Sequence, residues 1–153
     1  MDIRDSLRDE YVMIQGQYEA FDQRALSLKA LATPLLGTGL AFGIDKGSVP
    51  IVLATALVAL CLWVLEAIWK GFQYAYIERI ERLESWFREE KDDLKPFQVF
   101  ASWSASYRAR YRNSGAVLRL MAAPFVALPY ALIFLCALLA AGYLIGHPQT
   151  PCR

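Results

Sequence analysis

Glu66 is the residue of this sequence with the clearest chemical potential. It is the first charged residue after an uncharged apolar run at 51–65, and Lys70 follows four positions later. An ionisable group inside an apolar helix often lines a polar path through a membrane protein, so Glu66 is a candidate for a polar lumen in an oligomer. Residues four apart on a helix also pair with each other, and the nearby Trp63 and Trp69 are typical of a boundary with lipid headgroups. A local ion pair at that boundary is the simpler interpretation, and we favour it.

Three arginines end another candidate segment, which is aromatic along one side. Arg108, Arg110 and Arg112 follow Trp103 closely in the sequence. Such a cluster could bind the phosphates of a nucleic acid or a nucleotide. Aromatic side chains next to arginines are also typical of a helix at a membrane surface. Because a candidate membrane span follows at once, we expect membrane lipid as the partner of these residues and do not expect nucleic acid.

Catalytic patterns are missing from the sequence. The single histidine, His147, stands near the C-terminal end without a nucleophile and a carboxylate around it. Asp92 and Asp93 are adjacent, so they lie on different sides of a helix and do not converge on a metal ion. The three cysteines have no CxxC spacing, and no glycine-rich phosphate loop or HExxH is present. We expect no enzymatic activity, no cofactor and no metal site.

Composition and its distribution point to a membrane protein. The chain has 153 residues, of which 56% are hydrophobic, above the usual share of about 45–50% in soluble domains. Charged residues are almost absent from 30–44, 51–65 and 120–146 and dense elsewhere. This segregation predicts an all-α integral membrane protein with three transmembrane helices and a smaller part in water.

The first half of the chain predicts a helical hairpin. Residues 2–28 carry apolar side chains at steps of three and four over more than three heptads, which indicates a helix with one apolar seam. We expect this helix to continue into a first span at about 25–44. Gly39 and Gly43 form a GxxxG in that span, which allows close backbone contact with another helix. The contact is either with the second span of the same chain, which we favour, or with another protomer.

A short polar turn at 45–50 requires the second span, at about 51–70, to return antiparallel to the first. No proline lies within residues 51–95, so we expect one helix across that whole stretch. Its second half carries apolar residues on one face, namely Phe72, Tyr76, Ile80, Leu83 and Phe87. We expect this seam to pair with the first one as two long stalk helices in a coiled coil, so that residues 1–95 form one membrane-and-stalk hairpin.

The remaining chain is predicted as three pieces. Residues 96–115 form an amphipathic segment at the membrane surface, residues 116–146 a third transmembrane span, and residues 147–153 a tail. Pro124 and Pro129 predict an angled entry into the third span and a straighter helix from Pro129 onward.

Lysine and arginine counts give the orientation. Residues 70–119 hold ten of these cations and the N-terminal segment three arginines, whereas the turn and the tail hold only Lys46 and Arg153. The positive-inside rule places the stalks and the N-terminus in the cytoplasm and the C-terminus outside. We expect a multi-pass protein of the bacterial inner (plasma) membrane.

The sequence of residues 66–84, EAIWKGFQYAYIERIERLE, resembles that of small bacterial membrane proteins, which have the motif FQxxYIxRIxxLE just after the second of two spans. The plan of residues 2–95 resembles the two-transmembrane SLATT-type effectors of prokaryotic defence loci, in which a membrane hairpin is flanked by helices. The resemblance implies an oligomerising membrane effector that perturbs the inner membrane when a partner activates it.

Two functions follow as hypotheses. The first is a membrane protein that oligomerises through its spans and stalk, as a pore-like or membrane-perturbing effector. The alternative is an accessory or scaffold subunit whose stalk docks a cytoplasmic protein partner in a helix-to-groove manner.

Overall fold

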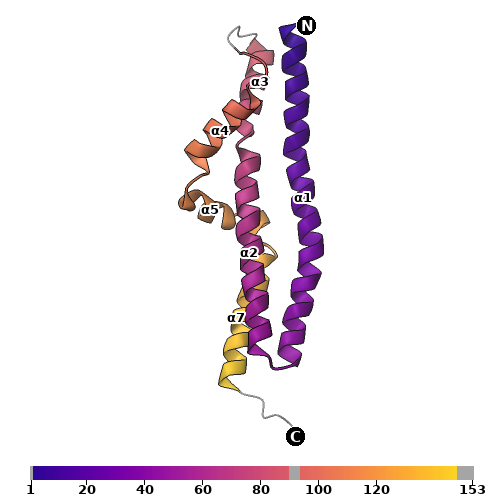
Figure 1. Ribbon diagram of the computed structural model, residues 1–153, viewed down its shortest axis with the longest axis vertical. Coiled ribbons are helices and arrows are strands. Elements are labelled where there is room, and N and C mark those ends of the chain that lie inside the picture. The colour runs from indigo at the N-terminus through magenta and orange to yellow at the C-terminus, as the bar shows by residue number, and fades with distance from the viewer. Residues whose placement is uncertain (1, 90–93, 148–153) are drawn as a thin grey trace. The chain divides into compact units, whose positions relative to one another are not determined.

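The computed structural model describes residues 2–89 and 94–147, and all regular structure in these ranges is helical. The helices are α1 (Ile3–Asp45), α2 (Val49–Tyr74), α3 (Ile77–Glu89), α4 (Val99–Arg110), α5 (Ser114–Met121), α6 (Pro124–Ala127) and α7 (Tyr130–Gly146) (Figure 1). The predicted all-α class is therefore confirmed. Two stretches, Ile3–Asp45 and Val49–Arg88, are long and apolar enough to cross a membrane, and α7 is a shorter apolar helix.

The chain divides into two compact units. Met1–Ala25 and Ile68–Leu120 form one, here called the charged unit, while Leu26–Ala67 and Met121–Arg153 form the other, called the apolar unit. Helices α1 and α2 each contribute to both units. The units thus combine segments that are distant in sequence.

The apolar unit contains the turn that joins α1 to α2. Gly47 lies in this turn with a φ of 60°, a backbone conformation that glycine adopts without steric cost. The two helices pack on each other and on α7 through alanines and larger apolar side chains. One buried cluster contains Ala32, Leu36, Ala59, Tyr130 and Ile133, and a second contains Val52, Ala56, Ala137, Ala141 and Leu144.

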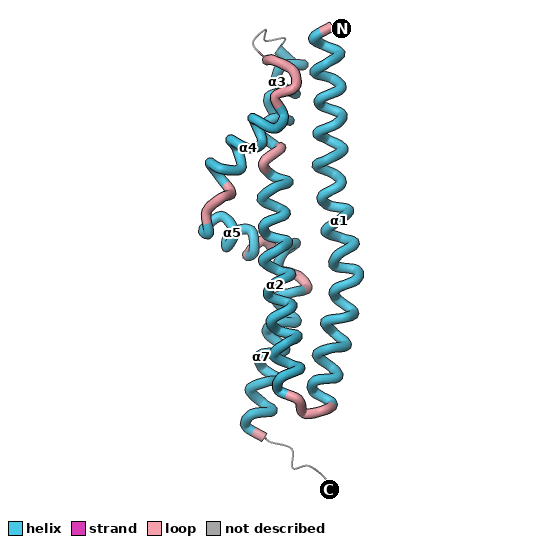
Figure 2. The backbone as a smooth tube through the Cα atoms, in the orientation of Figure 1, coloured by secondary structure: helices cyan, strands magenta, loops and turns pink. Residues whose placement is uncertain are grey.

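The predicted third span is not one helix. Residues 114–146 are divided into α5, α6 and α7, and the breaks lie at Pro124 and Pro129 (Figure 2). The residue before each proline has an extended backbone, with ψ values of 130° at Ala123 and 134° at Leu128, because a proline ring disfavours the helical region for its predecessor. The final portion, which the sequence predicts to be straighter, is the 17-residue helix α7. In the predicted tail, residues 148–153 lie outside the described residues.

The charged unit brings the two predicted seams together. Leu7 and Ile14 of α1 and Leu83 of α3 are fully buried in one cluster. Ile80 and Phe87, the other seam positions of α3, are partly buried and pack against this cluster.

The prediction of one helix over residues 51–95 is wrong. The helix is interrupted at Ala75 and Tyr76 (Figure 2), where the Tyr76 N–H donates to the Gln73 carbonyl at 3.1 Å, three residues back rather than four. The Phe72 carbonyl, which a continuous helix would have paired with Tyr76, accepts instead from the Trp103 indole N–H at 2.9 Å. A side chain from α4 therefore stabilises the break, and residues 51–95 contain no signal for it.

The end of α3 also differs from the prediction. The helix ends at Glu89, and residues 94–95 are not helical. Residues 90–93, which include the adjacent Asp92 and Asp93, lie outside the described residues. The predicted segment 96–115 contains α4 and the corner into α5, where the Asn113 side chain accepts the Ala116 N–H at 2.7 Å as an N-terminal cap.

Candidate functional site: a buried glutamate in the apolar unit

Glu66 lies inside the apolar unit and is 1% exposed. Its Oε1 is 2.7 Å from Nζ of Lys29, whose side chain is 20% exposed. The predicted local partner, Lys70, belongs to the charged unit and pairs with Asp22. Glu66 therefore forms its ion pair with a residue 37 positions earlier in the chain, because α1 packs on α2 within the apolar unit.

Lys29 also binds the irregular segment between α5 and α7. Its ammonium donates a hydrogen bond to the carbonyl of Phe125. A continuous helix would have satisfied this carbonyl with the N–H of residue 129, and Pro129 has none. The Trp63 indole N–H makes a similar contact, donating to the Met121 carbonyl at 3.0 Å. Side chains from α1 and α2 thus hold the backbone on both sides of Pro124.

Tyr130 completes the site. It is fully buried at the start of α7, and its hydroxyl is within electrostatic reach of Glu66. The Tyr130 hydroxyl lies beside the Glu66 carboxylate, although neither it nor the second carboxylate oxygen has a hydrogen bond of good geometry among the described residues. The site therefore has an ion pair with a hydroxyl next to its carboxylate. This arrangement can hold a proton or a water molecule, but it contains no nucleophile paired with a base.

Gly39 and Gly43 lie where α1 meets α2 in the apolar unit. A Cβ atom on Gly43 would lie 2.8 Å from Cγ2 of Val52, and one on Gly39 would lie 3.0 Å from Oγ1 of Thr55. The distance at Gly43 is shorter than real Cβ atoms show, and the distance at Gly39 would require the Thr55 side chain to shift slightly. These glycines therefore serve close packing within the chain, the first of the two alternatives drawn from the sequence.

The charged unit contains a second buried ion pair, between Arg79 and Glu10. Arg79 Nε is 2.7 Å from Glu10 Oε1, and the two side chains are 3% and 0% exposed. The remaining groups bind the connection before α4: Arg79 Nη2 donates to the Lys95 carbonyl at 2.8 Å, and Glu10 Oε2 accepts the Phe97 N–H at 2.6 Å. Phe97 has a φ of 61°, which is rare for a residue with a side chain. Sequence reasoning missed this pair because the two residues are separated by 69 positions.

Lys70 is the centre of a third polar cluster, also in the charged unit. It donates to Asp22 and, at 2.8 Å, to Gln73 Oε1, while Gln73 Nε2 donates to the Tyr18 carbonyl at 2.8 Å. Burial alone would raise the pKa of the Asp22 carboxyl, but hydrogen bonds from Lys70 and Gln73 and the charge of Lys70 lower it below its ordinary value. Asp22 is therefore held in its ionised form.

The predicted membrane-surface residues of α4 have different environments. The Trp103 ring stacks on Tyr107, with ring centroids 5.5 Å apart, and its N–H binds α2 as described above. Arg108 Nε donates to the Ser104 carbonyl of its own helix at 3.1 Å. Arg110 Nη2 is 3.9 Å from a Glu78 carboxylate oxygen, and Arg112 is exposed. Contact of these residues with lipid stays a prediction.

Comparison with protein families, with curated proteins and with solved structures gives no match. The resemblance to SLATT-type effectors therefore also stays a prediction.

Proposed function

We propose that this chain is a small multi-pass protein of the bacterial inner (plasma) membrane, with the apolar unit in lipid and the charged unit in the cytoplasm. One observation carries the proposal. In the apolar unit large apolar side chains are exposed and a charged side chain is buried, the opposite of the arrangement in a soluble domain. Leu31 and Leu139 are 65% and 76% exposed, whereas Glu66 is buried and paired with Lys29, which is 20% exposed. Large exposed apolar surfaces are unfavourable in water and ordinary in lipid.

The charges at one end of the apolar unit fit this proposal. Asp45 and Lys46, in the turn between α1 and α2, are 70% and 59% exposed, as expected of a loop that leaves the bilayer. The positive-inside rule then gives a cytoplasmic N-terminus and an extracytoplasmic C-terminus. Reporter fusions test the orientation: a reporter before residue 1 and one at Glu89 should report the cytoplasm, and one after His147 the opposite side. Residue 1 and Glu89 on opposite sides would contradict the hairpin.

The activity we propose is homo-oligomerisation of a pore-like or membrane-perturbing effector. Since Gly39 and Gly43 pack against α2 of the same chain, contact between protomers requires another surface. Gly142 and Gly146 of α7 form a second GxxxG, and a Cβ atom at either position would meet open space. Two small residues four apart on an uncovered face favour close contact between helices in lipid.

Cross-linking in the membrane tests this proposal. The double variant Gly142→Leu/Gly146→Leu should reduce the dimer and higher bands several-fold, because the larger side chains keep two copies of α7 apart. Gly37→Leu is the matched control, since that glycine also faces open space within an apolar helix. A native chain that is monomeric at every concentration would end the oligomer proposal, and an equal loss in the control would remove the role of α7.

The alternative is a scaffold that docks a cytoplasmic protein partner on the charged unit. The observation in its favour is an apolar hollow of about 350 Å³ lined by Tyr76, Val99, Phe100 and Trp103. Phe100 is 76% exposed, and such a side chain commonly anchors a partner helix. Affinity capture separates the two functions: a stable partner that is lost in Phe100→Ser, without ion leakage on overexpression, favours the scaffold.

A further inference from the structure

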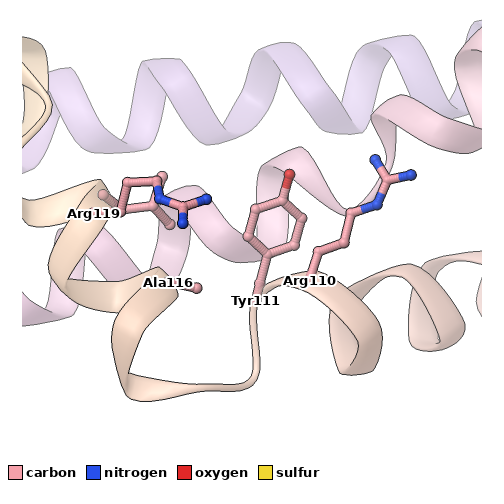
Figure 3. A pocket seen from close by; sticks show the side chains of 5 residues that line it. Arg110, Tyr111, Ala116 and Arg119 are labelled. Carbon is pink, nitrogen blue, oxygen red and sulfur yellow. The ribbon is translucent and has the colours of Figure 1, made fainter.

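A cavity of about 260 Å³ lies in the charged unit, at the corner between α4 and α5. Its lining residues are Arg110, Tyr111, Ala116, Arg119 and Leu120. In Figure 3 the two arginines lie on either side of Tyr111 and come from different helices, with Arg110 in α4 and Arg119 in α5. The cavity therefore has two guanidinium groups and a phenol above an apolar wall.

The positive charge of this cavity is poorly compensated. Arg119 forms no ion pair or hydrogen bond with any residue in 2–89 or 94–147. Within the described part of the chain, the ion-pair partner of Arg110 is the Glu78 carboxylate, 3.9 Å from its Nη2. The other oxygen of Glu78 is 2.6 Å from Arg82 Nη2, so the Glu78 charge is compensated mainly by Arg82. An anion placed between Arg110 and Arg119 would supply the missing charge.

We propose that this cavity binds a phosphate group, as a monoester or a diester. A guanidinium presents two parallel N–H donors that match phosphate oxygens. In Figure 3 the two guanidinium groups stand on opposite sides of the Tyr111 ring, so the arginine side chains must turn toward the ligand for one phosphate to contact both. A tetrahedral phosphate offers oxygens in several directions, which suits donors that approach from two sides. The volume is below the roughly 300–1,000 Å³ of cavities that enclose larger ligands, so it suits a headgroup-sized molecule. Ala116 and Leu120 give the apolar part of such a molecule a place to pack.

Gly71 of α2 positions this cavity. A Cβ atom on Gly71 would lie 3.4 Å from Cβ of Tyr111 and 3.6 Å from Cδ1 of Leu120. The wall of the cavity therefore rests directly on the α2 backbone. A large side chain at this position must displace Tyr111 or Leu120, which separates the two arginines without removing either charge.

Binding of defined phosphates to the full-length chain in neutral detergent tests the proposal. The probes are dihexanoyl phosphatidic acid, glycerol 3-phosphate and, as the zwitterionic comparison, dihexanoyl phosphatidylcholine. The native chain should bind phosphatidic acid at least tenfold more tightly than phosphatidylcholine. Arg110→Gln/Arg119→Gln should weaken phosphatidic acid binding at least tenfold, because two charge-assisted contacts are lost.

Two further variants make the result specific. Arg8→Gln/Arg24→Gln removes the same charge from exposed residues of α1 that do not line the cavity, and should change affinity less than twofold. Gly71→Leu keeps every arginine and should weaken binding nearly as much as the double variant Arg110→Gln/Arg119→Gln. Equal weakening in the Arg8/Arg24 control, or full affinity in both Arg110→Gln/Arg119→Gln and Gly71→Leu, would overturn the site in favour of diffuse attraction.

The two anionic probes separate the sources of phosphate. Binding of phosphatidic acid without glycerol 3-phosphate assigns a lipid headgroup, an outcome that rests on the proposed membrane location. Comparable binding of both assigns a small soluble phosphate and does not depend on that location. If neither binds the native chain, the phosphate site is refuted, while the membrane proposal is tested separately by the reporter fusions.

Discussion

The ion pair between Lys29 and Glu66 gives the sharpest test of the apolar unit. Lys29→Met removes the ammonium and keeps most of the apolar stem, leaving a carboxylate that is 1% exposed. Removal of one partner of a buried pair costs about 3–5 kcal/mol, because the other charge is left uncompensated. We expect a loss of about 3 kcal/mol, near the low end, since the pair is not fully buried: Lys29 is 20% exposed.

Removal of the Glu66 carboxylate is expected to lower the free energy of unfolding less than removal of the Lys29 ammonium. Glu66→Leu leaves Lys29, which is 20% exposed and keeps its hydrogen bond to the Phe125 carbonyl. A lysine at this position can move its ammonium toward solvent or headgroups, so we expect a loss of about 1–2 kcal/mol. The double variant Lys29→Met/Glu66→Leu replaces the pair with apolar side chains and should lie within about 1 kcal/mol of the native chain.

Equilibrium unfolding in mixed micelles, followed by circular dichroism, measures the four states of this double-mutant cycle. The expected coupling is about 3–5 kcal/mol, the sum of the two single losses less the loss of the double variant. Asp45 and Lys46, 3.2 Å apart and largely exposed, provide a control pair in the same unit, whose coupling should stay below about 1 kcal/mol. Additive losses at Lys29 and Glu66 would refute the buried pair.

Three further predictions concern packing and pH. Leu83→Asp should destabilise the charged unit by a few kcal/mol, because a charge enters a fully buried cluster; unchanged chemical unfolding would show that the position is not buried. Gly43→Leu should destabilise the chain by about 1–3 kcal/mol, because its side chain would meet Val52, and a thermal unfolding scan should give a lower Tm for it than for Gly37→Leu. The lowered pKa of Asp22 contributes stability that is present above the unfolded pKa near 3.8 and is lost as pH falls through the lower folded pKa. The native chain should therefore lose stability in acid below pH 3.8, and a pH series with Asp22→Asn should give a flatter profile there.

The features that the sequence predicts correctly are those encoded locally. The heptad spacing around Leu7 and Ile14 predicts the buried face of α1, and both residues are fully buried. Gly47 predicts the turn between α1 and α2, and Pro129 predicts the start of α7. Each prediction depends on the geometry of one helix or on the conformational limits of one residue type, so one stretch of sequence is enough.

The polar contacts could not be predicted in the same way. The rule that residues four apart form pairs suggests Lys70 for Glu66, but the structure pairs Glu66 with Lys29. Arg79 and Glu10 both look like parts of solvated helix faces in the sequence, and they are buried against each other. Such pairs depend on the rotation of one helix about its axis relative to another. Periodicity defines the apolar face of each helix, but it does not say which charge at the edge of one face meets which charge on the other.

The buried polar contacts of the apolar unit have a further consequence for its packing. Leucine and alanine contacts are nearly interchangeable, so apolar packing alone would tolerate several alignments of the segment before α7. The carbonyl of Phe125 accepts from Lys29, and the carbonyl of Met121 accepts from Trp63. Sliding the segment by one residue would break both hydrogen bonds, and in an apolar environment a lost donor is not replaced by water. We infer that the lysine and the tryptophan select one alignment of this segment even if the ion pair adds little net stability.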